Sequence, residues 1–337
     1  MTSARFKVHF AGPLVTFQDA GRIGHLRFGV PASGPMDRFS FAAAHAALAQ
    51  DKTATAIEVS LGGIVLECTD GAASIAVAGG DFRVTCAGHD STGWGVHTLH
   101  SGDKITIRAG AWGSWTYLAF AGRVETPKWL GHAATHALSG FGGGALAAGD
   151  TFDVHDAVVL ENRNGGIPVP TIAKPSHRIH VVLGPQDHHF ETQSIQAFQT
   201  QTFHVTDAFD RMGMRLDGPK MDMRDALSIP SEPIMRGSVQ VSGDGAATVL
   251  LADHQTTGGY PKIATVLSSE TDRLTQSRSG DALSFVAITP ERAAHESAEF
   301  RDVCAAYLTE LALPKASLSE RLMTLNLIDG VVADTPD

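Results

Sequence analysis

The chain has few cysteines and no long apolar run, and each absence removes a class of protein. Its three cysteines, Cys68, Cys86 and Cys304, are odd in number, far apart and without the short spacing of metal ligands. We therefore expect neither a disulfide framework nor a zinc site. No apolar stretch approaches the roughly 18 residues of a membrane helix, and the start lacks a basic segment leading into an apolar one. We expect a cytoplasmic protein without a membrane partner.

Positive charge is also scarce. The 337 residues include 26 Lys and Arg against 36 Asp and Glu, a formal net charge of -10, and the basic residues are scattered. A nucleic-acid partner would require a basic stripe, so we expect none. Of the sixteen histidines, only His188 and His189 are adjacent, and neighbours in a strand point to opposite faces. We expect no metal site.

Short strands dominate the pattern that is present. Runs of β-branched and aromatic residues are broken by Gly, Asp or Ser at regular spacing, which is typical of a β-barrel or sandwich rather than βαβ units. They occupy residues 6–10, 14–17, 56–60, 64–68, 74–78, 82–86, 104–107 and 114–120. One alanine-rich helix is predicted at 38–50. Asp37 precedes it, either as its N-cap or facing a cleft beside the Ser33-Gly34 turn.

A weak internal repeat divides the chain. Glu58, Gly63 and Gly71 recur as Glu232, Gly237 and Gly245 at a constant offset of 174 residues. Arg22-Ile23-Gly24 has a counterpart in Arg211-Met212-Gly213 at an offset of 189. Such self-similarity predicts two related β-domains. We place the first at 1–160, a Pro- and Gly-rich linker at 161–177, the second at 178–289 and a helical tail at 290–337.

Candidate ligand-binding side chains are concentrated between Asp253 and Ala264, directly after the apolar run 248–252. Two glycines allow the backbone to approach a ligand, two threonines offer hydroxyls, and Lys262 adds a mobile cation. This combination predicts a ligand-binding loop, and the alternative is an ordinary surface turn. The other glycine-rich stretch, 140–144, lacks the Gly-Lys-Ser/Thr ending of a phosphate-binding loop, so we expect only a loop there.

Five motifs together resemble one family: Gln18–Arg22, Gly29–Asp37, Asp210–Gly213, Gly237–Val241 and, above all, Gln255–Ala264. They are similar to the Kip-antagonist family, also called allophanate hydrolase subunit 2 or the biotin-dependent carboxyltransferase family. That family includes one of the subunits of bacterial 5-oxoprolinase and the carboxyltransferase domain of urea carboxylase. The resemblance, which runs from about residue 8 to residue 288, implies a mainly β fold of two related cyclophilin-like β-barrels with a few short helices. It also implies a small partner protein of the Kip-inhibitor type.

The sequence departs from the family pattern in three places. Ala121-Gly122-Arg123 and Gly131–Thr135 replace a Gly-Gly pair and a Gly-Ser-x-Ser-Thr turn, and Glu232-Pro233 replaces the usual Glu-Gly. These departures leave open a substrate that differs from that of the best-known members.

Two reactions fit the resemblance. The first is ATP-dependent hydrolysis of 5-oxoproline to glutamate, with a LamB/YcsF-type protein as a further candidate partner and with ATP on this chain or on a partner. The second transfers a carboxyl group from carboxybiotin, carried by a partner, to a urea-like or amide nitrogen. Lys262 is the candidate cation for either reaction, and the candidate acids or bases are Asp37, Glu232 and Asp253.

The remaining candidate residues are predicted to bind substrate. Gln240 and Gln255 both donate and accept, which suits a small amide or lactam. Thr256 and Tyr260 are neutral donors, and Ser33 lies beside the cleft considered for Asp37. Arg211 either holds a carboxylate or pairs internally with Asp210. A third hypothesis from another class is a regulatory binding protein that acts through protein contacts without turnover.

Overall fold

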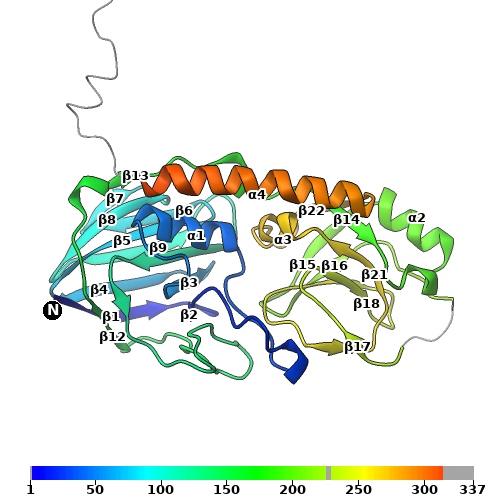
Figure 1. Cartoon of the computed structure of the whole chain (residues 1–337), viewed down its shortest axis with the longest axis horizontal. Coiled ribbons are helices and arrows are strands. Elements are labelled where there is room, and N and C mark those ends of the chain that lie inside the picture. Colours follow the sequence, from blue (N-terminus) through cyan, green and yellow to red (C-terminus); the bar gives the residue numbers. More distant parts are fainter. Residues whose placement is uncertain (1, 225–228, 314–337) are drawn as a thin grey trace, which may run out of the picture.

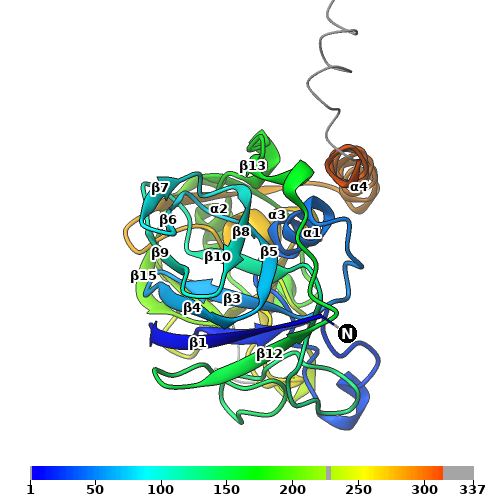
Figure 2. The same cartoon turned by 90° about the vertical axis from the view of Figure 1, so that its left-hand side faces the viewer.

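The computed structural model describes residues 2–224 and 229–313. It shows two β-rich halves side by side, with one long helix running over both (Figure 1). The view from one end shows the strands of the first half stacked in layers and the long helix end-on (Figure 2).

The first half consists of two antiparallel sheets. Alternate residues of β1 are buried, such as Phe6 and Val8, because one face of its sheet packs on the core. Phe6, Phe120 and Phe152 meet there with ring centroids 5.0–5.5 Å apart. The seven-stranded sheet runs in the order β11 (Arg123–Val124), β12 (Thr151–His155), β1 (Ser3–Ala11), β4 (Ile64–Asp70), β9 (Lys104–Ala109), β6 (Phe82–Cys86), β7 (His89–Ser91). The six-stranded sheet runs β13 (Gly165–Gly166), β8 (Gly95–His100), β5 (Ala72–Ala78), β10 (Trp115–Phe120), β3 (Ala56–Ser60), β2 (Thr16–Gln18).

The second half is a closed barrel. Its strands follow the order β14 (Arg178–Leu183), β21 (Lys262–Val266), β18 (Ser238–Val241), β19 (Ala247–Leu250), β16 (Gly213–Asp217), β15 (Phe203–Phe209), β22 (Ala282–Ala287). Among the seven strands of this barrel, only β14 and β22 pair in parallel. A separate two-stranded ribbon joins β17 (Glu232–Pro233) to β20 (Thr257–Gly258).

The described α-helices lie on one side of the molecule (Figure 1). They are α1 (Arg38–Ala47), α2 (Thr192–Thr200), α3 (Ser268–Leu274) and α4 (Pro290–Ala312), with 3-10 turns η1 (Leu26–Phe28), η2 (Glu161–Arg163), η3 (Thr171–Ala173) and η4 (Asp187–His189). Thr289 caps α4 by accepting from the Arg292 amide, and Pro290 occupies its first position. None of the helices in these described ranges is both long and apolar enough to cross a membrane.

The mainly β fold with a C-terminal helix is confirmed, and the second half is the closed barrel that the resemblance implies. In the first half, the strands form two packed sheets. Helix α1 begins where expected but ends at Ala47, because Ala49 turns the chain with φ +54°. The predicted tail is helical up to Ala312, and the predicted part 314–337 lies outside the described residues.

The loop before α1 is held between the two halves. Arg236 of the barrel side donates to the Pro35 carbonyl at 3.0 Å, and Thr275 donates to the Met36 carbonyl at 3.1 Å. From the first half, Glu58 accepts from the Met36 amide at 2.7 Å. These buried contacts fix how the barrel sits against the first half.

Candidate functional site

Four polar side chains form a row across the outer face of the barrel. Arg215 lies opposite Thr248 and Thr248 opposite Gln240. Gln240 in turn lies opposite Lys262 of the fourth strand, after a register shift between Val239 and Gln240. Directly opposed residues on antiparallel strands share a face of the sheet. The residues that alternate with them, Met214, Val249 and Val239, lie in the barrel core. The row therefore offers a hydroxyl and an amide between two cations.

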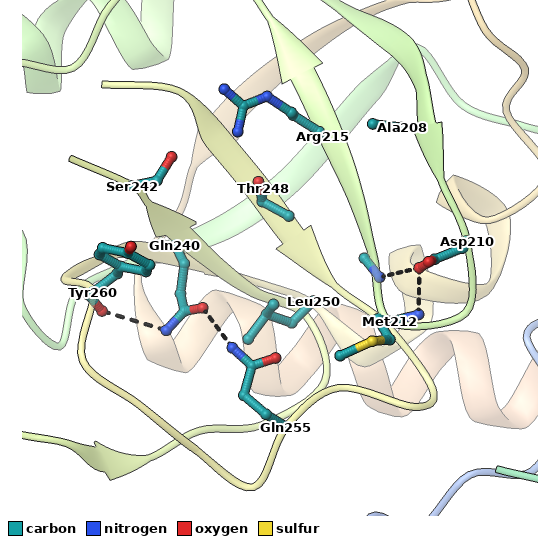
Figure 3. A pocket seen from close by; sticks show the side chains of 11 residues that line it. Ala208, Asp210, Met212, Arg215, Gln240, Ser242, Thr248, Leu250, Gln255 and Tyr260 are labelled. Carbon is teal, nitrogen blue, oxygen red and sulfur yellow. Dashed lines mark hydrogen bonds between the residues drawn. The ribbon is translucent and has the colours of Figure 1, made fainter. Parts of the chain in front are cut away.

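A pocket of about 280 Å³ lies over three members of this row, Arg215, Thr248 and Gln240, whereas Lys262 does not line it. Figure 3 shows Gln240, Gln255 and Tyr260 converging at one end and Arg215 at the other. Gln240 donates to the Tyr260 carbonyl at 3.4 Å, and Gln255 donates to the Gln240 side-chain oxygen at 3.3 Å. Both hydrogen bonds are long, so a ligand amide can replace them at little cost. The full lining is Ala208, Asp210, Met212, Gly213, Arg215, Gln240, Ser242, Thr248, Leu250, Gln255 and Tyr260.

Lys262 closes the row with a buried ammonium group. Its side chain is 4% exposed, and its Nζ has no hydrogen-bond acceptor among the described residues. The nearest charge is the Glu232 carboxylate, whose Oε2 lies 3.5 Å from Nζ. An ammonium has three donors, and a buried cation is costly when its donors are not satisfied. The geometry thus leaves Lys262 able to bind an anionic or carbonyl oxygen.

Glu232 and Gln186 stand next to Lys262. The Gln186 side chain accepts from the Lys262 backbone amide at 3.0 Å and donates to the Glu232 carboxylate. Glu232 is half-exposed at 52% and sits on the ribbon β17–β20, where it pairs with Gly258. The predicted residues Lys262, Glu232, Gln240, Gln255 and Tyr260 are therefore brought into one region.

Arg211 and Asp253 lie elsewhere, in a buried ion pair between the halves. Arg211 donates from Nε and Nη2 to the two Asp253 oxygens at 2.9 and 3.0 Å, and also to Glu58 and to the Gly34 carbonyl. Burial alone would raise the pKa of Asp253, but the Arg211 charge and its hydrogen bonds outweigh it, so the pKa is lowered. All three Arg211 nitrogens are thus engaged, which leaves none for a substrate carboxylate.

Asp210 does not pair with Arg211. Its Oδ1 accepts from the amides of Met212 and Gly213 at 2.7 and 3.2 Å, so its side chain shapes the turn at the rim of the pocket.

Asp37 is the N-cap of α1, which confirms one of its two predicted roles. One oxygen accepts from the Ser40 amide at 2.9 Å, and the other accepts from the Ser40 hydroxyl and from Gln276 at 2.6 and 2.7 Å. Its burial, together with the nearby Asp272 charge, raises the pKa of Asp37 to about 6. This carboxylate faces protein groups and not the pocket.

Ser33 and Thr256 are the two remaining predicted residues. Ser33 is buried at the edge of the ion pair, beside Asp253, with φ +52°. Thr256 is half-buried, and its carbonyl accepts from the Ile234 amide at 3.2 Å. Neither lines the pocket over the row.

Sequence reasoning missed Arg215, Thr248 and Gln186. The alternation of Met214 and Leu216 with Arg215 is a period-two signal that places Arg215 on the outer face of a strand. No comparable signal marks Gln186, whose position depends on the turn after β14.

Neither a metal site nor a phosphate cradle is found among residues 2–224 and 229–313. No group of three or more His, Cys, Asp and Glu side chains could hold a metal there. In the glycine-rich stretch, the amides of Gly140, Phe141, Gly143 and Gly144 all donate to nearby protein oxygens at 2.7–3.4 Å. These amides are therefore not available to a nucleotide phosphate.

Comparison with known proteins identifies relatives for most of the chain. The family model described as carboxyltransferase domain, subdomain A and B, matches residues 28–287. A 5-oxoprolinase subunit of Escherichia coli (strain K12) is 30% identical over 294 residues, 85% of this chain and 92% of that relative. The urea amidolyase of Saccharomyces cerevisiae is 30% identical over 311 residues, 85% of this chain but 17% of that relative.

A solved structure shows the same fold. The crystal structure of Kluyveromyces lactis urea carboxylase matches with a TM-score of 0.82 at 23% identity, over 95% of this chain and 30% of that chain. The chain thus spans nearly all of the 5-oxoprolinase relative, whereas it spans only a minor part of the urea-processing enzymes. By the family match over residues 28–287, the chain belongs to the carboxyltransferase domain family, subdomain A and B.

Proposed function

We propose that this chain is the component of a 5-oxoprolinase-type complex that binds the lactam substrate, and that the row from Arg215 to Lys262 holds it. The observation that carries the proposal is the row itself, in which Gln240 lies between Arg215 and Lys262. A pocket of about 280 Å³ covers Arg215, Thr248 and Gln240. The 5-oxoprolinase relatives, which align over about nine-tenths of their length, support the choice.

The substrate 5-oxoproline carries a carboxylate and a ring amide, and each has a partner in the row. Arg215 is the cation for the carboxylate, since guanidinium matches carboxylate geometry. Its present partner is the exposed Asp244 carboxylate, with Nη2 and Oδ2 2.5 Å apart, which a substrate can displace. Gln240 and Gln255 recognise the lactam N–H and C=O.

Hydrolysis adds water to the lactam carbonyl carbon, breaks its bond to nitrogen and places a proton on that nitrogen. Lys262 stabilises the negative charge that develops on the carbonyl oxygen, because its buried Nζ has no hydrogen-bond acceptor within residues 2–224 and 229–313 and gains one there. Glu232, 3.5 Å from Nζ and half-exposed, accepts the proton of the attacking water and passes it to the leaving nitrogen.

ATP supplies the activation that the lactam bond requires in such a complex. The amides of Gly140, Phe141, Gly143 and Gly144 are engaged by the protein. We therefore assign nucleotide binding to a partner of the Kip-inhibitor type or the LamB/YcsF type.

Carboxyl transfer is the second candidate, because the matching family model carries that name. The same row suits a carboxylate donor with an amide or urea acceptor: Lys262 or Arg215 would hold the carboxylate, and the Gln240 amide would face the nitrogen. A partner chain would carry the biotin.

The test is to isolate the tagged chain with its partners from its source cells and assay the assembled complex. We expect ATP hydrolysis that depends on 5-oxoproline and releases glutamate, with no biotinylated protein on a streptavidin blot. A biotinylated partner, together with bicarbonate-dependent carboxylation of urea or an amide, would replace this proposal with the second candidate.

A further inference from the structure

Two loops lie together on the side of the molecule away from α4, and we call residues 20–32 and 127–145 the two-loop surface. Figures 1 and 2 both show the dark-blue loop with η1 next to the green loop of the first half. The Arg22 guanidinium sits 4.7 Å from the Trp129 ring centroid, and Asp19 accepts from the Ala133 amide at 2.7 Å. The two loops therefore form one continuous surface.

This surface exposes large apolar side chains. Ile23 is 81% exposed, Leu138 76% and Phe28 66%. Leu26, Leu130 and Phe141 are also exposed. Backbone hydrogen bonds hold the loops in place, for example from the Phe28 amide to the His25 carbonyl at 2.9 Å. Large exposed apolar side chains on two ordered loops that contact each other are typical of an interaction site.

Its charge is opposite to that of the whole chain. The protein has a formal net charge of -10, yet neither segment of the two-loop surface contains an Asp or Glu. Arg27 and Lys128 are exposed there, and three histidines accompany them. An acidic partner surface would complement this charge, whereas a basic one would not.

Beneath the surface, Arg22 has one guanidinium nitrogen without an acceptor. The side chain is fully buried; Nε donates to the Trp129 carbonyl at 3.3 Å and Nη2 to the Ala134 carbonyl, but Nη1 has no partner in the described part of the chain. Its repeat counterpart Arg211 binds two carboxylates with the same group. The Arg22 charge is balanced by the nearby carboxylates of Asp19 and Asp253, so the exposed cations of the surface are Arg27 and Lys128.

We propose that the two-loop surface docks a partner protein that presents carboxylates beside apolar side chains. A nucleic acid would require a basic stripe, which these two exposed cations do not form. A wide anionic membrane is disfavoured by the net charge of the chain. The Ala137 amide of the surface donates to Asp253 at 2.9 Å, so the partner docks next to the ion pair that joins the halves. The inference does not depend on Lys262 or on the proposed reaction.

The test uses fluorescence anisotropy with the full chain and a short labelled peptide of alternating glutamate and leucine or phenylalanine. Matched peptides carry lysine in place of glutamate, or serine in place of the apolar residues. We expect the acidic apolar peptide to bind at least about tenfold more tightly than either matched peptide. Its affinity should fall as the salt concentration is raised.

Substitutions in the two-loop surface test whether the peptide binds there. Arg27→Glu with Lys128→Glu, and separately Phe28→Ser with Phe141→Ser, are expected to lose about tenfold or more in affinity. The matched charge control, Lys7→Glu with Arg178→Glu on exposed strand positions, should bind like wild type, as should Lys262→Ala. Equal binding of acidic and basic peptides, full binding by the surface variants, or preferential binding of phosphatidylserine vesicles would each overturn the proposal.

Discussion

Arg211 and Asp253 form a two-bonded ion pair at the junction of the two halves, with nitrogen to oxygen distances of 2.9 and 3.0 Å and both side chains buried. Glu58 of the first half binds the same guanidinium. The Arg211 guanidinium therefore joins the barrel to the first half through hydrogen bonds to protein groups.

Asp253→Asn is expected to lower the free energy of unfolding by about 3 kcal/mol, because removing one partner leaves a buried charge only partly compensated. Chemical denaturation, monitored by fluorescence, measures this change in the free energy of unfolding. Asp244→Asn, which breaks the exposed pair with Arg215, is the control and should lower the free energy of unfolding far less. Equal effects of the two substitutions would contradict the role given to the buried pair.

Asp37 should make stability depend on pH in mildly acidic solution. Its folded pKa of about 6 lies above the unfolded value, so its favourable contribution is complete below about pH 4 and is lost as pH rises through about 6. Relative to Asp37→Asn, the wild-type chain is expected to lose about 3 kcal/mol of unfolding free energy across that window. Parallel pH profiles for the two proteins would show that Asp37 titrates normally.

Arg163 joins the ends of two helices. It donates to the carbonyl of Ala47 at the end of α1 at 3.2 Å, and to Leu311 and Ala312 at the end of α4 at 3.4 and 2.7 Å. Arg163→Met removes these bonds and a cation that favours helix C-termini, so about 1–3 kcal/mol should be lost.

Hydrogen exchange gives the local readout for Arg163. The last turns of α4 should exchange faster in Arg163→Met, whereas Arg292→Met, which removes an exposed pair with Glu296 within the same helix, should leave them unchanged. Unchanged exchange in both variants would mean that α4 is held by its apolar contacts alone.

Arg215 should act on the substrate carboxylate only. In the assembled complex, Arg215→Gln is expected to raise KM for 5-oxoproline by about 10- to 100-fold, the value of a charge-assisted hydrogen bond, with little change in kcat. For 2-pyrrolidinone, which lacks the carboxylate, Arg215→Gln should change neither constant. An equal loss with both lactams would remove Arg215 from carboxylate binding.

The sequence revealed the strands and the loop before Lys262 because these features are local. Alternation along single strands and the cap at Asp37 depend on near neighbours, and both are found in the structure. The pairing of Arg211 with Asp253 and Glu58 joins residues 42 and 153 positions apart, so no local pattern reports it.

The same limit applies to the candidate site. Asp253 and Arg211 have the residue types of a catalytic group and a carboxylate binder, but burial commits them to each other. Arg215, Thr248 and Gln240 become a site only through strand register, which the sequence does not specify.

The most direct measurement compares Lys262→Met with wild type in the assembled complex. Because Lys262 Nζ has no hydrogen-bond acceptor among the described residues and lies 3.5 Å from its nearest carboxylate, the fold should not need its charge, and the free energy of unfolding should not fall. We expect kcat to fall by about 100-fold or more while the partners still copurify. An intact complex with kcat within about twofold of wild type would contradict the assignment of this row as the catalytic site.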